Sequence, residues 1–200
     1  FTTPAWAADG DLDDSFSGDG KLIYSRSTKK DYLYHVFTQA NGDLVVGGYD
    51  NNNPSCSSCV RWANHEFDSS GTTTNQFPTA DDKKLFWSPK TDIIREMLLM
   101  SDGRFAMVGQ AGTHSTNSNK DYDCAVAVRK ANGSLDTTGF NASNYQPDTV
   151  VFNSGSQGRY YVGFSNNVDD ACWAGALQAD DKIIAGGYIA TNSADIALAR

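Results

Sequence analysis

The stretch Gln178-Ala-Asp-Asp-Lys-Ile-Ile-Ala-Gly-Gly-Tyr188 has two diverged copies earlier in this chain of 200 residues. They are Gln39-Ala-Asn-Gly-Asp-Leu-Val-Val-Gly-Gly-Tyr49 and Met100-Ser-Asp-Gly-Arg-Phe-Ala-Met-Val-Gly-Gln110. Their second glycines, Gly48, Gly109 and Gly187, lie 61 and 78 residues apart. Each copy predicts two strands joined by a two-residue turn, because Asn-Gly, Asp-Gly or Asp-Asp suits the positive φ angles of a tight hairpin. The pattern therefore indicates an internal repeat.

A second motif alternates with the first. We match Lys130-Ala-Asn-Gly-Ser-Leu-Asp136 with Trp62-Ala-Asn-His-Glu-Phe-Asp68 and Ala7-Ala-Asp-Gly-Asp-Leu-Asp13, which places His65 at the turn position of Gly133. The strand Asp123-Cys-Ala-Val-Ala-Val-Arg129 is echoed by Asp195-Ile-Ala-Leu-Ala-Arg200. We expect an N-terminal arm or signal-peptide remnant at residues 1–8, then a single all-β repeat domain at residues 9–200. The approximate repeats are 9–68, 69–136 and 137–200.

The composition fits a globular β protein. Eighteen glycines and a 12% share of aromatic residues are typical of short strands joined by tight turns. No apolar run approaches the roughly 20 residues needed to span a bilayer. The net charge of -8, without clustered Lys or Arg, argues against a nucleic-acid partner.

The strand pattern predicts β-propeller-like blades. We interpret residues 92–100 as a strand, and we expect Leu33, His35 and Phe37 to face one way while Tyr34 and Val36 face the other. One repeat cannot bury both its faces, so stacking of repeats would supply the core. Propellers usually have four or more blades. About three four-stranded blades would therefore form an open structure or be completed by another chain.

The residues also resemble the delta-60 repeat of bacterial exported proteins. The likeness rests on Leu12-Asp13-Asp14-Ser15-Phe16 with Gly18-Asp19-Gly20-Lys21, and on residues 176–188 with Asp195 to Arg200. It covers nearly all of the chain, although the middle copy departs from the pattern at Ile94-Arg95-Glu96. The resemblance implies a β-propeller fold and export. It implies no activity.

Four cysteines, an even number, suit an oxidising compartment. Cys56 and Cys59 lie in a polar Asn/Ser loop, which favours a local disulfide. A thioredoxin-like redox motif would need a strand-to-helix turn, and a zinc site would need a second ligand pair. Cys124 and Cys172 would then pair with each other and join neighbouring strands.

Ligand sites on repeats usually occupy positions that vary between copies. Tyr34, Arg95 and Trp173 share one such position, and His35 and Glu96 share the next. If these strands ring a channel, their side chains would bind a sugar or a peptide. The alternative is that Tyr34 and Trp173 are core packing.

Asp9, Asp11 and Asp13 are closely spaced carboxylates of the kind that bind Ca²⁺, although the turn motif of the repeat explains them equally well. Apart from that calcium hypothesis we expect no cofactor.

The function most consistent with these features is a secreted or cell-surface, non-enzymatic structural or interaction protein, in an extracellular or periplasmic location. It would recognise a protein or a glycan, or assemble with itself into an oligomer or filament through unpaired strand edges. The alternative is an extracellular carbohydrate-binding or carbohydrate-active propeller enzyme, with Glu96 and Asp92 as acids.

Overall fold

A computed structural model describes residues 10–26, 28–51, 60–74, 91–112, 122–141, 158–164, 168–190 and 194–200. These residues form ten strands in three antiparallel sheets, none of which closes on itself. The first sheet contains β1 (Asp31–Thr38), β2 (Leu44–Asp50) and β3 (Arg61–Phe67). The middle sheet contains β4 (Ile93–Leu99), β5 (Phe105–Gly112), β6 (Tyr122–Arg129) and β7 (Arg159–Val162). The third contains β8 (Asp170–Leu177), β9 (Ile183–Ala190) and β10 (Ala194–Ala199).

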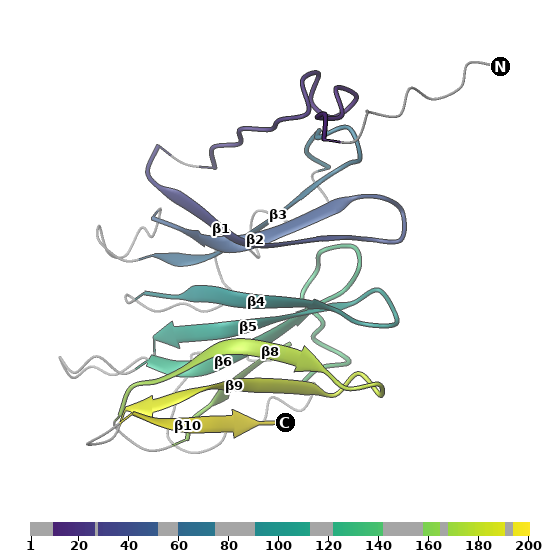
Figure 1. Cartoon of the computed structure of the whole chain (residues 1–200). Helices are drawn as coiled ribbons and strands as arrows, with labels where there is room; N and C mark the ends of the chain where they lie inside the picture. Colours follow the sequence, from purple (N-terminus) through teal and green to yellow (C-terminus); the bar gives the residue numbers. More distant parts are fainter. Residues whose placement is uncertain are drawn as a thin grey trace.

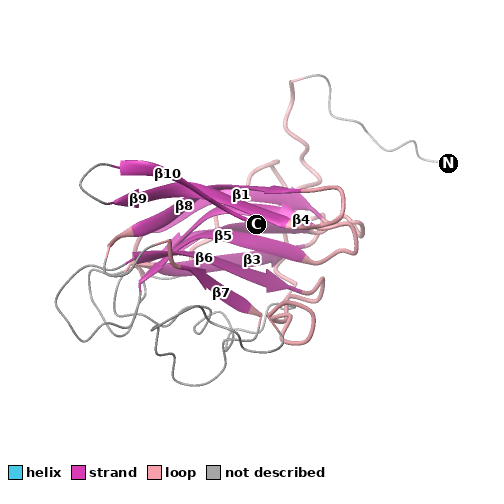
Figure 2. Ribbon diagram, turned by 90° about the horizontal axis from the view of Figure 1, so that it is seen from below, coloured by secondary structure: helices cyan, strands magenta, loops and turns pink. Residues whose placement is uncertain are grey.

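The three sheets stack face to face, with the middle sheet between the other two (Figure 1). Seen at right angles to that view, their strands overlie one another (Figure 2). The all-β prediction is confirmed, as is the strand predicted at residues 92–100, which is β4. Four strands per repeat are seen only in the middle sheet within the described residues. No helix occurs in the described part of the chain, so none there is long and apolar enough to cross a membrane.

The repeated hairpin turn differs from the predicted two-residue turn. In the first copy Gln39 N–H donates to Asp43 O at 2.8 Å, and Gly42 N–H donates to Gln39 O at 3.0 Å. Gly42 has a φ of 90°, whereas Asn41 is not among the described residues with positive φ. The loop is therefore a type I turn followed by one left-handed residue, a three-residue connection with its own preference for glycine. The other copies repeat this pattern at Gly103 and Asp181.

The match at His65 was wrong. His65 lies in the middle of β3, paired with Val46. The turn that corresponds to Lys130–Ser134 is Asp68–Thr72, because both are closed by the same hydrogen bonds and both contain a left-handed glycine, Gly133 or Gly71. The two segments have similar sequences, but the hydrogen bonds show that Lys130 corresponds to Asp68, six residues after the Trp62 that the sequence match had chosen.

Each first strand carries a β-bulge at the same repeat position. The pairing register shifts between Leu33 and His35, between Ile94 and Glu96, and between Cys172 and Ala174. The residues that bulge out are therefore Tyr34, Arg95 and Trp173. A bulge re-aims a side chain and can terminate regular alternation.

The repeated second glycine follows from the bulge. A Cβ added at these glycines would overlap a backbone carbonyl oxygen of the facing strand, at Tyr32 for Gly48, Ile93 for Gly109 and Ala171 for Gly187. The approach of that carbonyl leaves no room for any side chain.

The bulge also corrects the predicted alternation along β1. Phe37 packs against the middle sheet, with its ring 5.5 Å from that of Phe105. Leu33 lies instead with Val36 on the opposite face, where both line a cavity. One extra residue at Tyr34 moves Leu33 to the other side of the sheet.

The core lies between the sheets. One cluster joins the first and middle sheets and includes Trp62, whose indole N–H donates to the carbonyl of Gln110 at 2.9 Å. Two further clusters join the middle and third sheets. There Cys124 of β6 forms the predicted disulfide with Cys172 of β8, with the Cα atoms 4.7 Å apart. Cys56 and Cys59 lie outside the described residues.

Candidate functional site

The bulged residues from all three sheets meet in one cluster. β4 lies between β1 and β8, so its bulged residue Arg95 reaches both neighbours. The Arg95 guanidinium carbon lies 4.5 Å from the ring centre of Trp173 and 5.7 Å from that of Tyr34. Both distances allow a cation–π interaction. The three positions chosen from the sequence are thus brought together.

His35 and Glu96, which share the next repeat position, form an ion-pair geometry beside this group. His35 Nδ1 lies 3.0 Å from Glu96 Oε1, and His35 Nε2 hydrogen-bonds the backbone carbonyl of Arg95. With both ring nitrogens engaged, the imidazole bridges β1 and β4. The five residues Tyr34, His35, Arg95, Glu96 and Trp173 are called the bulge cluster below.

The bulge cluster has an aromatic rim that the sequence analysis missed. Tyr49 stacks on Tyr32 with ring centres 4.7 Å apart and lies 5.8 Å from Tyr34. On the other side, the ring of Tyr188 lies 6.4 Å from that of Trp173. Burial and a hydrogen bond to Tyr34 raise the pKa of the Tyr49 hydroxyl. The sequence could have predicted this rim from the residue that follows the repeated second glycine, which is a tyrosine in two of the three copies, Tyr49 and Tyr188.

The bulge cluster presents groups suited to non-covalent recognition. Trp173 is 56% exposed and Tyr34 is 46% exposed, so neither is core packing. Arg95 Nε has no hydrogen-bond partner among the described residues, although Nη2 lies 3.5 Å from Gln110 Oε1. Exposed rings provide flat apolar contact, while the guanidinium donates to a carbonyl, hydroxyl or carboxylate.

Asp92 was the acid proposed to act with Glu96, and its environment differs from that of Glu96. The Asp92 carboxyl is fully buried and accepts a hydrogen bond from the Gly112 amide at 2.8 Å. Burial raises its pKa well above the ordinary value. Glu96 is instead paired with His35 at the sheet edge. The two acids therefore have separate partners.

The calcium hypothesis stays a prediction, since Asp9 lies outside the described residues. Asp11 and Asp13 are exposed. The Asp13 carboxylate accepts hydrogen bonds from the hydroxyl and the amide of Ser15, at 2.6 and 3.0 Å, which lower its pKa. Within the part of the chain that the structure describes, no three His, Cys, Asp or Glu side chains gather around a possible metal position.

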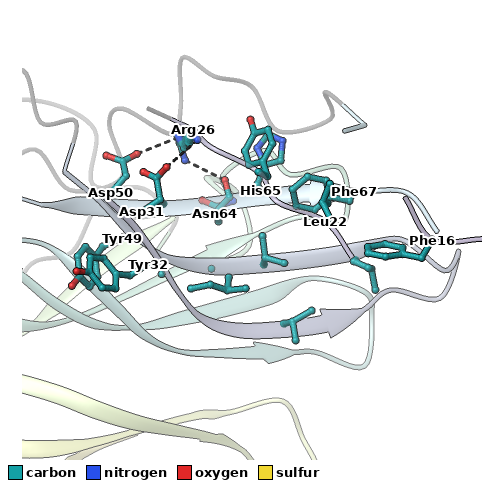
Figure 3. Close-up of a pocket in the computed structure, with 18 residues that line it drawn as sticks. Phe16, Leu22, Arg26, Asp31, Tyr32, Tyr49, Asp50, Asn64, His65 and Phe67 are labelled. Carbon is teal, nitrogen blue, oxygen red and sulfur yellow. Dashed lines mark hydrogen bonds and ion pairs between the residues drawn. The ribbon is translucent and has the colours of Figure 1, made fainter. Parts of the chain in front are cut away.

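A cavity of about 370 Å³ lies on the outer face of the first sheet, which faces away from the middle sheet. Side chains of β1, β2 and β3 line one side of it, and residues from the segment 16–26 line the other (Figure 3). Arg26 holds this segment against the sheet. Its Nε lies 3.3 Å from Asp50 Oδ2, and its Nη1 donates to the Asn64 carbonyl at 3.3 Å (Figure 3).

The other end of the cavity is aromatic. The ring of Tyr24 stacks on His65 with centres 4.5 Å apart, and Phe67 lies at 4.9 Å from the same imidazole. Burial, with a smaller contribution from the charge of Arg26, lowers the pKa of His65. The cavity thus combines an apolar lining with one imidazole, His65, whose neutral form is favoured. Sequence reasoning missed it because its two sides are joined only by folding.

No protein-family model matches this chain, and no curated protein matches it either. The bulge cluster and the cavity are therefore interpreted from their own geometry.

Proposed function

We propose that the chain is an exported, non-enzymatic binding scaffold of propeller-like blades, which recognises a partner at the cell exterior through the bulge cluster. The observation that carries this proposal is that three repeats deliver their one bulged side chain to the same edge of the stack. Regular strands would have kept Tyr34, Arg95 and Trp173 in the ladder. A bulge redirects the side chain of the extra residue, and here the bulge and the glycine opposite it occur together in all three sheets.

Three features support the blade arrangement and the export. The first strands β1, β4 and β8 line up along one edge, as the strands that face the central channel of a propeller do. The Cys124–Cys172 disulfide joins two sheets and suits an oxidising compartment such as the periplasm or the exterior. The resemblance to the delta-60 repeat points the same way.

A glycan is the partner that the exposed rings favour over a protein. A half-exposed Trp and Tyr flanking a cation offer stacking surface for a sugar ring and donors for its oxygens. Hydrolysis would need two carboxylates facing one bond, roughly 5 to 10 Å apart. The Asp92 carboxyl is buried and cannot contact a sugar bound at the surface, so we favour binding without catalysis.

The test is a binding screen of the labelled chain on an array of bacterial and plant polysaccharides. The best polysaccharide is then titrated while tryptophan fluorescence is followed. We expect Trp173→Ala to weaken binding at least tenfold. Arg95→Lys should weaken it as well, because lysine keeps the charge and loses the planar stack.

The matched control is Ile23→Ala, which removes an apolar side chain that is 97% exposed and does not line the cavity. It should leave the affinity unchanged. Circular dichroism would verify that all variants are folded. Binding by no polysaccharide on the array would contradict a glycan partner, and binding that Trp173→Ala leaves unchanged would remove the bulge cluster as the site.

A further inference from the structure

Neighbouring sheets pack through a repeated pairing of a larger side chain with a glycine. Met97 of β4 lies over Gly47 of β2, where an added Cβ would overlap its sulfur and lie 3.3 Å from its Cε. One sheet further on the sizes are reversed: Gly175 of β8 receives Val108 of β5, whose Cγ2 lies 3.0 Å from an added Cβ. In both interfaces a first-strand residue meets a second-strand residue of the preceding sheet.

The strand registers extend this pairing to the two outer faces of the stack. The first-strand position is occupied in the three sheets by Val36, Met97 and Gly175. The second-strand position is occupied by Gly47, Val108 and Gly186. The first sheet therefore presents a valine on its outer face, and the third sheet presents a glycine on the opposite outer face.

Both outer faces are apolar. The segment 16–26 packs on β3 of the first sheet and leaves the part of that face along β1 exposed. Val36 is 61% exposed beside the cavity on the first sheet. On the third sheet Leu198 lies next to Gly186, and Leu198 and Ile196 are 69% and 90% exposed. Ile196 occupies the repeat position of Trp62 and Cys124, which are buried against the following sheet. The outer faces thus lie on opposite sides of the stack and carry the two halves of its internal interface (Figure 1).

We propose that a second copy of this chain docks head to tail, with β1 of one copy on β9 and β10 of the other and Val36 seated over Gly186. The contact continues the two interfaces already present within the chain, in the same register. A second copy is the fitting occupant because one chain carries both complementary faces. Such a contact is heterologous, so further copies add until a ring closes or a filament grows.

The expected association is reversible. A face of three strands, each about seven residues long, covers roughly 14 by 23 Å. That footprint is about 320 Å² on each copy, well under the roughly 800 Å² per partner of a standard specific interface, so the contact is expected to be weak. Val36 and Ile196 are not among the five residues of the bulge cluster, so substituting them tests self-association while the bulge cluster of each chain stays intact.

The experiment is light scattering of the full, disulfide-intact chain over a hundredfold range of concentration. We expect the mean mass of the wild type to rise at least twofold. Ile196→Asp places a charge on the third sheet and Val36→Lys places one on the first, and each variant alone should remain monomeric. Both side chains are largely exposed, so neither change should disturb folding. Gly163→Asp, which places the same charge at an exposed position just after β7 of the middle sheet, should associate like the wild type.

Mixing the two variants distinguishes head-to-tail docking from a symmetric contact. Ile196→Asp keeps its β1 face and Val36→Lys keeps its third-sheet face, so an equimolar mixture should form dimers and nothing larger. If one face paired with itself, one of the two variants alone would still dimerise. A wild type that stays monomeric throughout, or a mixture that stays monomeric, would overturn the proposal.

Discussion

Replacing Gly109 with alanine should destabilise the whole stack, because this glycine faces the bulge of β4. The added Cβ would overlap the carbonyl oxygen of Ile93 and lie 3.1 Å from the backbone nitrogen of Arg95. Both neighbours are backbone atoms of a paired strand, so neither can rotate away. The hairpin must open locally, with overpacking of about 1–3 kcal/mol and the weakening of one ladder hydrogen bond at about 1 kcal/mol.

We therefore expect a loss of about 3 kcal/mol in the free energy of unfolding. For a chain of this length that corresponds to roughly 6–12 °C in Tm. The measurement is urea unfolding followed by far-ultraviolet circular dichroism, with a thermal scan beside it. Gly48→Ala and Gly187→Ala should behave alike, since each meets the equivalent carbonyl.

Gly163→Ala is the matched control. Gly163 is exposed, and a Cβ added there meets no atom within 4 Å. Its effect should stay within about 0.5 kcal/mol. If Gly109→Ala lost no more than Gly163→Ala, the close approach of the bulge carbonyl would not be the reason for the repeated glycine.

Two further predictions concern the disulfide and a buried acid. Replacing Cys124 and Cys172 with alanine opens a link across 48 residues and should cost about 2–4 kcal/mol in urea unfolding; an unchanged midpoint would contradict this. Burial raises the folded-state pKa of Asp92, so its favourable contribution is complete below the ordinary value of 3.8 and is lost as pH rises through the folded-state pKa. Asp92→Asn should therefore gain stability relative to the wild type as pH rises from acid to neutral, and a pH-independent difference between the two would refute the assignment.

The β character and the recurring hairpin could be derived from local patterns. The glycine-containing turns, the strand at residues 92–100 and the pairing of Cys124 with Cys172 all follow from composition, spacing and cysteine number. The shared position of Tyr34, Arg95 and Trp173 could also be found from the sequence, because aligning the three copies places these different residues in one column.

Tertiary structure decided what those positions do. A bulge is a mismatch between two strands and cannot be seen in either strand alone, so the alternation predicted for β1 failed at Leu33 and the turn match failed at His65. The cavity and the rim tyrosine Tyr32 likewise depend on segments brought together only by packing. Local periodicity determines which residues form strands. The register between strands, and which faces stay uncovered, depend on hydrogen bonds and packing between segments that are distant in the sequence.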